Sequence, residues 1–170
     1  MPNADLDALG LTSAPKNPKL SRKKTSKNIN KNGEESEHSL QRRATVMLSR
    51  IVSKPGITNQ YNTLWYGVDC GSPGSENRRM ANKNRGIESG ILDKDFYVDG
   101  KAFKIELKTK SGDYTNSQKE MIPQYKLAGV PTETARSLQE IVVALDKFKI
   151  RRKKIRFIEN DRYIWENEWA

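Results

Sequence analysis

Two carboxylates and a lysine stand out in the middle of the chain, because a predicted turn brings them together. Asp99-Gly100 separates two runs in which apolar residues alternate, and this pattern predicts a two-residue type I′ hairpin turn. In the register that this turn sets, Asp93 lies directly opposite Glu106. Paired residues point to the same face, about 5 Å apart at Cβ. Lys108, two residues after Glu106, shares that face.

Facing carboxylates repel each other, and a divalent cation between them turns that cost into a binding site. Hard oxygen ligands suit Mg²⁺ or Mn²⁺. An Asp…Glu-x-Lys set is the chemistry of metal-dependent phosphodiester cleavage, in which the metal activates water and the lysine stabilises the transition state. The alternative interpretation is an exposed strand with mixed charges. Glu106-Leu107-Lys108 is the single Glu-x-Lys of the chain, and with the hairpin register it favours the catalytic interpretation.

The composition of the chain narrows the function classes. Its 170 residues include 31 Lys+Arg against 21 Asp+Glu, a net charge of +10, which favours an anionic partner such as nucleic acid. A single cysteine, Cys70, excludes an internal disulfide, and a single histidine, His38, excludes the usual Cys/His zinc sites. A Ser-His-Asp hydrolase would depend on His38 alone. With no bilayer-spanning apolar run and no secretory h-region, we expect a cytoplasmic protein that is neither secreted nor membrane-bound.

Hydrophobic periodicity predicts an α/β domain, a mixed β-sheet with a central hairpin flanked by helices. In that hairpin, Phe103, Ile105 and Leu107 face the core. The first predicted elements are a helix over 36–53, a strand over 64–68, a long basic loop over 70–86 and the hairpin strands 91–98 and 101–108. They are followed by a helix over 116–127 capped by Thr115, a strand over 130–135, and a helix to Lys147 after a capping box at Ser137–Glu140. Within the helix over 116–127, Pro123 predicts a kink or a late start.

Two flanking segments differ in composition from this domain, which we place at 33–149. Residues 1–32 are predicted to form a disordered basic arm, or alternatively a solubilising tail without a role. Residues 150–170 form a basic and aromatic extension that contains Tyr163, Trp165 and Trp169. Its aromatic surface predicts either a homodimer interface or a segment that folds back onto its own core.

The stretch Gly86-Ile-Glu-Ser-Gly-Ile-Leu-Asp93, followed by Phe103-Lys-Ile-Glu-Leu-Lys108, resembles the PD-(D/E)XK nucleases, and more closely their VRR-NUC (virus-type replication-repair nuclease) branch. Further matches are Gly112, Thr115-Asn-Ser-Gln118, Gly129-Val130 and Ser137, so the resemblance covers roughly residues 34–147. The chain departs from the family pattern at Leu92, where a proline is common, and at Pro123. The resemblance implies a restriction-endonuclease-like core.

The resemblance also implies roles for individual residues. Read from the sequence alone, Glu37 is equally a helix N-terminal acid that complements the helix dipole, and Gln118 a plain first-turn residue. By resemblance, the metal ligands would be Glu37, Asp93, Glu106 and the Leu107 carbonyl, with Lys108 as the catalytic lysine and Gln118 lining the site.

Basic residues near these motifs are the candidates for DNA contacts. We expect Asp95 to pair with Lys104, which lies opposite it in the hairpin. A solvated charge run is the alternative for the long loop. The predicted DNA-binding residues are Arg78, Arg79, Lys83 and Arg85 in the loop, with Lys104 and Lys110 beside the site.

Together these features predict a metal-dependent, structure-selective DNA endonuclease that uses Mg²⁺ or Mn²⁺. Stand-alone members of the resembled branch are viral or bacterial, and some act as dimers on four-way junctions. The preferred substrate is therefore a four-way (Holliday) junction cut by a homodimer, in a bacterial or phage-infected cell. The alternatives are a flap, nick or non-specific DNA nuclease, and a non-catalytic basic DNA-binding protein.

Overall fold

The computed structural model describes residues 35–68, 90–158 and 161–170. The predicted order of helix, strand, hairpin, helix, strand and helix is confirmed, and two strands that the sequence analysis did not predict follow it. The elements are α1 (Glu37–Ile51), β1 (Thr63–Gly67), β2 (Lys94–Val98), β3 (Lys101–Leu107), α3 (Asn116–Leu127), β4 (Thr132–Ala135), α4 (Leu138–Lys147), β5 (Lys153–Phe157) and β6 (Tyr163–Trp169). The predicted arm and most of the predicted basic loop lie outside the described residues.

The main sheet of the described residues is mixed, as predicted, with the strand order β1-β2-β3-β4. Strands β1, β2 and β3 pair antiparallel, and β4 joins β3 in parallel. The hairpin register is confirmed, because Asp95 pairs with Lys104. Asp99 and Gly100 have φ angles of 48° and 77°, as a type I′ turn requires at both central positions.

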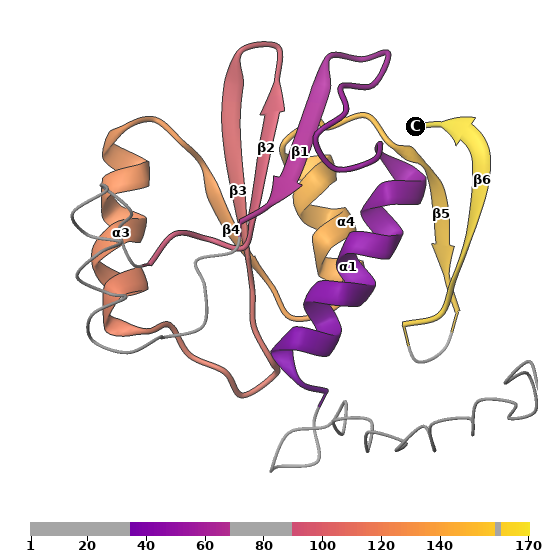
Figure 1. The fold of residues 1–170 in the computed structure, drawn as a ribbon. Helices are drawn as coiled ribbons and strands as arrows, with labels where there is room; N and C mark the ends of the chain where they lie inside the picture. Colours follow the sequence, from indigo (N-terminus) through magenta and orange to yellow (C-terminus); the bar gives the residue numbers. More distant parts are fainter. Residues whose placement is uncertain (1–34, 69–89, 159–160) are drawn as a thin grey trace, which may run out of the picture.

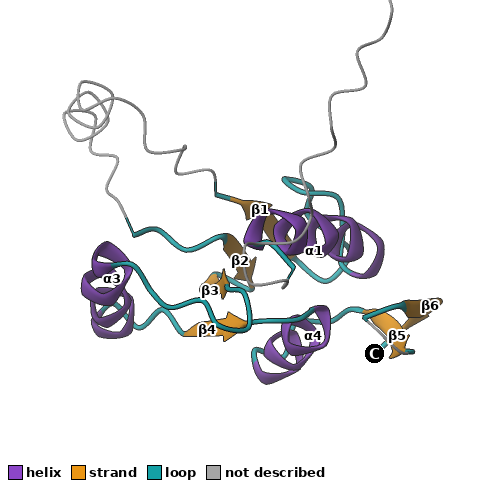
Figure 2. Ribbon diagram, turned by 90° about the horizontal axis from the view of Figure 1, so that it is seen from below, coloured by secondary structure: helices purple, strands orange, loops and turns teal. Residues whose placement is uncertain are grey.

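Helices cover both faces of this sheet (Figures 1 and 2). α1 and α4 lie on one face of the main sheet, and α3 lies on the other. The β5–β6 sheet lies beyond α1, on the side of that helix that faces away from the main sheet. The core lies between this face of the main sheet and the helices α1 and α4. There the apolar side chains that recur at helical spacing on α1 pack against the apolar side chains of the hairpin. Its fully buried side chains include Met47, Leu48 and Ile51 of α1, Trp65, Phe96, Ile105 and Leu107 of the sheet, and Leu138, Ile141 and Leu145 of α4.

The capping predictions for α3 and α4 are confirmed in part. Thr115 and Gln118 form a reciprocal capping box at the start of α3. This helix begins at Asn116 and continues through Pro123, so a late start is wrong. Before α4, the Ser137 hydroxyl accepts from the Glu140 N–H, but the Glu140 carboxylate accepts from the backbone of Arg136 instead of from Ser137. The predicted box at α4 is therefore only half formed.

The C-terminal extension folds back onto its own domain. Ile155, Phe157, Tyr163 and Trp165 pack against the main core from the β5–β6 sheet. The ring of Trp169 lies edge-on to that of Tyr61, with 4.9 Å between centroids. The aromatic side chains considered as a dimer interface are thus engaged within the chain, which was the alternative prediction for this segment.

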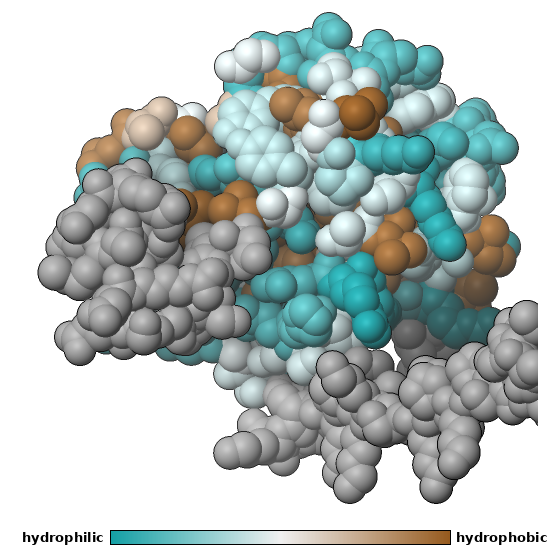
Figure 3. Space-filling model, in the orientation of Figure 1, coloured by the Kyte–Doolittle hydropathy of each residue, from teal (hydrophilic) through white to brown (hydrophobic). Residues whose placement is uncertain are grey.

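The described surface around α1 is hydrophilic. Figure 3 shows the face that carries α1, with hydrophilic side chains over most of it and hydrophobic side chains in separate small patches. Within residues 35–68, 90–158 and 161–170, no helix combines the length and the apolar character that a membrane span needs.

Removal of β5 and β6 should destabilise the domain. A chain that ends at Arg152 keeps the buried Ile150 but uncovers the apolar surface that β5 and β6 protect. We expect a lower urea midpoint than for the full chain, because apolar area returns to water. Ile164→Ala is the control, since Ile164 is 48% exposed and its truncation should cost less than about 0.5 kcal/mol. Equal urea midpoints for the full and shortened chains would show that β5 and β6 do not contribute to the stability of the domain.

Candidate metal centre

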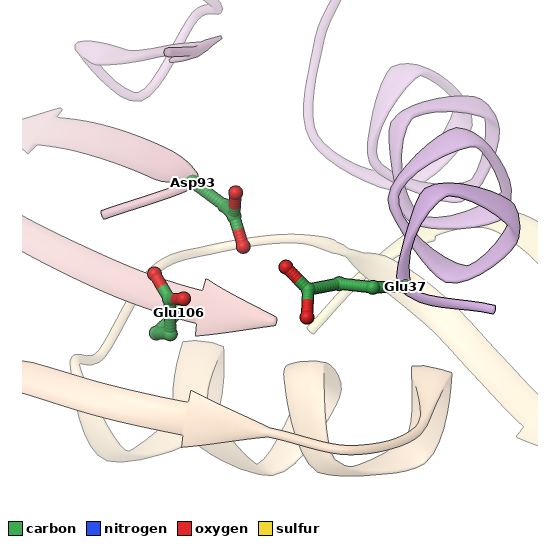
Figure 4. A group of neighbouring side chains, drawn as sticks. All are labelled: Glu37, Asp93 and Glu106. Carbon is green, nitrogen blue, oxygen red and sulfur yellow. The ribbon is translucent and has the colours of Figure 1, made fainter. Parts of the chain in front are cut away.

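Three carboxylates from separate elements meet at one end of the sheet (Figure 4). Glu37 comes from the first turn of α1, Asp93 directly precedes β2, and Glu106 lies near the end of β3. One carboxylate oxygen of each residue lies within 4.8 Å of the others. Asp93 and Glu106 lie one position beyond the last ladder pair, so the hairpin register delivers them as predicted.

Local backbone features hold Asp93 in place. The Leu107 N–H donates to its Oδ2 at 2.8 Å, and the Gln41 side chain donates to its Oδ1 at 2.7 Å. Gly90, three residues earlier, has a φ of 86°, and a Cβ there would collide with the backbone of Ser117. Only glycine therefore lets the segment leading into β2 approach the start of α3 so closely.

Glu106 is the most deeply buried acid of the group, at 1% exposure. Its Oε1 accepts from the Lys108 ammonium at 2.6 Å and from the Gln118 side chain. Its Oε2 is buried and has no hydrogen-bond partner. A buried acceptor left without a partner costs about 1–3 kcal/mol, so a cation at Oε2 fits what this carboxylate lacks.

Lys108 is buried between two of the acids. Its side chain is 5% exposed, and its ammonium lies 3.7 Å from Glu37 Oε2 as well as beside Glu106. Burial by itself lowers the pKa of Lys108, but the hydrogen bond and charge of Glu106, with the charges of Glu37 and Asp93, raise it overall. Lys108 is therefore a fixed positive charge within the carboxylate group.

The carboxylates titrate above their ordinary range. Burial, followed by repulsion from Asp93, raises the pKa of Glu106 to about 7. Burial is also the main cause that raises the pKa of Asp93 and of Glu37. Near neutral pH Glu106 is partly protonated, and a bound cation would displace that proton, so metal affinity should rise with pH. Burial lowers the pKa of the adjacent Lys94, against the attraction of Asp93.

The donor set suits a hard divalent cation. Glu37, Asp93 and Glu106 offer only carboxylate oxygens, the ligands that Mg²⁺ and Mn²⁺ prefer. Glu37 is partly exposed, at 41% of its side chain, so the group opens toward solvent on the α1 side. The side chain of Leu107 lies in the core and its N–H binds Asp93, while the role of its carbonyl stays a prediction.

The structure brings the three acids together with Lys108 and Gln118, as predicted. Two of the basic residues predicted to contact DNA, Lys104 and Lys110, lie among the described residues. Lys104 pairs with Asp95, as expected, and lies 4.8 Å above the Tyr125 ring with only 11% of its side chain exposed. This pairing leaves little of the Lys104 ammonium for a DNA phosphate. Lys110 is exposed beyond β3. Four of the predicted contacts lie outside the described residues: Arg78, Arg79, Lys83 and Arg85.

Two site residues escaped the sequence analysis. Gln41 follows Glu37 by four positions, so both lie on one face of α1, and this spacing could have identified it. Lys94 pairs with Ile105 in the hairpin, which places a lysine on the apolar face of the sheet. That exception to the apolar pattern was readable from the same register that located Asp93.

Comparisons of this chain with protein family models, with curated proteins and with solved structures find no match. The resemblance to the PD-(D/E)XK nucleases thus rests on the motif residues themselves.

The stability of the metal-free protein should fall as pH rises from about 5 to about 7. The folded chain holds the Glu106 proton up to a pKa of about 7, whereas an unfolded chain releases it near about 4.3. Between these values the folded state binds more protons, so rising pH favours unfolding. Glu106→Gln removes this titration, and its unfolding free energy should fall less steeply, by on the order of 1–3 kcal/mol. Urea unfolding in EDTA at several pH values measures both slopes, and equal slopes would contradict the burial argument.

Proposed function

We propose that this protein is a metal-dependent endonuclease that hydrolyses phosphodiester bonds of DNA, built on a restriction-endonuclease-like core. One observation carries the proposal: a buried Glu106 with an unpartnered Oε2 lies within reach of Asp93 and Glu37 and in contact with Lys108. A protein that only binds DNA has no use for three converging acids, which repel both each other and the phosphate backbone.

The residues divide the work of such a reaction. Glu37, Asp93 and Glu106 would hold Mg²⁺ or Mn²⁺, which when bound supplies Lewis-acid stabilisation and an activated water. The Lys108 ammonium is oriented by Glu106 and offers a positive charge to the phosphate oxygens as negative charge develops. Gln118 and Gln41 are positioning residues, since each donates one hydrogen bond to an acid, Gln118 to Glu106 and Gln41 to Asp93.

The substrate class rests on charge and on the count of active sites per chain. The net charge of +10 supports binding to a polyanion. The sequence contains a single Glu-x-Lys, which supports one incision per chain, so paired incisions across a four-way junction would require two copies related by a twofold axis. We therefore propose a homodimer acting on junctions, with flap, nick or non-specific cleavage as the alternative substrate preference. We do not base this interface on the aromatic residues of the C-terminal extension, because Tyr163 and Trp165 pack against their own core.

Cleavage assays test this proposal directly. Linear duplex, flap, fork and four-way junction DNA are incubated with Mg²⁺, Mn²⁺ or EDTA. We expect metal-dependent cutting, with paired nicks on the junction, and at least about a 100-fold loss of rate in Asp93→Asn and Glu106→Gln, because each removes an ionic ligand. Wild-type rates in either variant would overturn the site. Light scattering identifies the oligomer, and a monomer that cuts only flaps would favour the alternative substrate.

Lys108→Met should lose turnover while it keeps metal affinity. The ammonium stabilises charge in the transition state and competes with a cation for the acids, so its removal leaves the ligands intact. Calorimetric titration with Mn²⁺ and single-turnover rates separate the two effects. Lys108→Arg should rescue poorly, because a planar guanidinium does not reproduce a compact ammonium. Lys126→Met, on the last turn of α3, is the exposed control. A Lys108 variant that lost Mn²⁺ binding but kept its rate would refute this role.

A further inference from the structure

A cavity of about 760 Å³ opens beside the carboxylate group, between α1 and the segment that leads into β2. Its lining includes the acids Glu37 and Asp93 and the basic residues Arg42 and Lys94, with His38 and Thr45 beside them. Val68 and Ile91 contribute apolar surface. His38 and Arg42 are exposed on the first turns of α1. The volume is within the usual range for a ligand site, and the polar lining suits a charged ligand.

Lys94 is the unusual member of this lining. It is 6% exposed and lies on the same face of the sheet as Phe96, where the core packs. Its ammonium donates to the Thr45 hydroxyl at 3.3 Å. None of the ion pairs found among the described residues includes Lys94. A buried ammonium without a paired anion is costly, so this arrangement needs an explanation.

The neighbours of Lys94 leave space for its ammonium at the cavity. Gly67 pairs with Lys94 across β1 and β2, and a Cβ on Gly67 would lie 3.0 Å from the Lys94 nitrogen. The Thr45 hydroxyl donates to the Gln41 carbonyl at 2.9 Å, which directs a lone pair of its oxygen to Lys94. Gly67 thus leaves room for the Lys94 ammonium, and the Thr45 hydroxyl holds the ammonium at the cavity wall by accepting its hydrogen bond.

The charge of Asp93 does not satisfy Lys94 once a metal is bound. Both oxygens of Asp93 already accept hydrogen bonds, from Gln41 and Leu107, and the carboxylate belongs to the proposed ligand set. A cation there neutralises Asp93, which leaves the Lys94 ammonium to be compensated by another anion. In a nuclease the available anion is a phosphate of the bound strand.

We propose that Lys94, held by Thr45 and flanked by Arg42 and His38, forms a second phosphate subsite. It binds a backbone phosphate next to the one that is cleaved. The inference rests on the proposed nuclease function, and it adds a positioning contact that sets where the strand lies relative to the carboxylates. Because Glu37 and Asp93 line the same cavity as Lys94, the subsite adjoins the proposed metal centre and would hold the strand beside it.

Equilibrium binding of the full chain to a labelled DNA duplex, followed by anisotropy in EDTA and in Ca²⁺ at several salt concentrations, tests the subsite apart from cleavage. In Ca²⁺, Lys94→Met should weaken binding about tenfold, as expected for a lost charge-assisted contact, and lower the slope of log K against log salt by about 0.9. Lys101→Met is the matched control, since Lys101 is exposed at the other end of the same hairpin and should leave both values close to wild type. An unchanged affinity and slope in Lys94→Met would overturn the subsite.

Two further variants guard against a folding defect. Gly67→Ala should weaken DNA binding by displacing the ammonium while it leaves every charge in place. Lys94→Arg should retain the salt slope, because it keeps the positive charge. Urea midpoints near wild type confirm folding in both. Strong DNA binding in Gly67→Ala with a normal midpoint would contradict the placement of Lys94.

The source of the phosphate is tested with duplexes that carry or lack a 5′-phosphate. A backbone subsite predicts the same loss for Lys94→Met on both duplexes, whereas a loss confined to the phosphorylated duplex would overturn the backbone assignment. The outcomes also separate the two proposals. A wild-type chain that cuts no DNA, although Lys94→Met lowers the slope, contradicts only the nuclease function. A chain that cuts DNA with binding insensitive to Lys94 contradicts only the subsite.

Discussion

The burial of one carboxylate, that of Glu106, constrains the whole arrangement at this end of the sheet. A charge at 1% exposure must be neutralised or hydrogen-bonded, and here Lys108 and Gln118 share one oxygen while the other has no partner. Lys108 directly follows β3, the strand that contains Glu106, whereas Gln118 lies in the first turn of α3. The start of α3 must therefore lie beside the end of β3. The left-handed Gly90 makes that close approach possible.

α1 serves both the core and the site. The stripe that contains Leu40, Met47 and Leu48 is buried against the sheet. The adjoining stripe presents Glu37 and Gln41 to the carboxylate group and to the cavity beside it. Because one rigid element carries both stripes, the position of Glu37 relative to Asp93 is set by core packing rather than by a loop.

Charge is segregated by the two faces of the β2–β3 hairpin. Asp95, Lys104 and Glu106 share the face toward α3, where each acid has a lysine partner. Lys94 is the buried lysine of the opposite, apolar face, where it donates to the Thr45 hydroxyl and takes part in none of the ion pairs found among the described residues. Lys104 is therefore part of a structural ion pair with Asp95, whereas Lys94 is a cation that lines a cavity. This difference is the reason why we assign a ligand-binding role to Lys94 and not to Lys104.

The sequence by itself determined the hairpin, its register and the closeness of Asp93 to Glu106, because Asp99-Gly100 allows one tight turn and side chains alternate with period two. It also determined most helix boundaries, through the caps at Thr115 and Ser137. Only the tertiary structure decided that Glu37 reaches the pair and that Gln41 supports it. It also decided that β5 and β6 cover their own core. These contacts join segments far apart in the chain, and local propensity carries no information about which distant surfaces will bury one another.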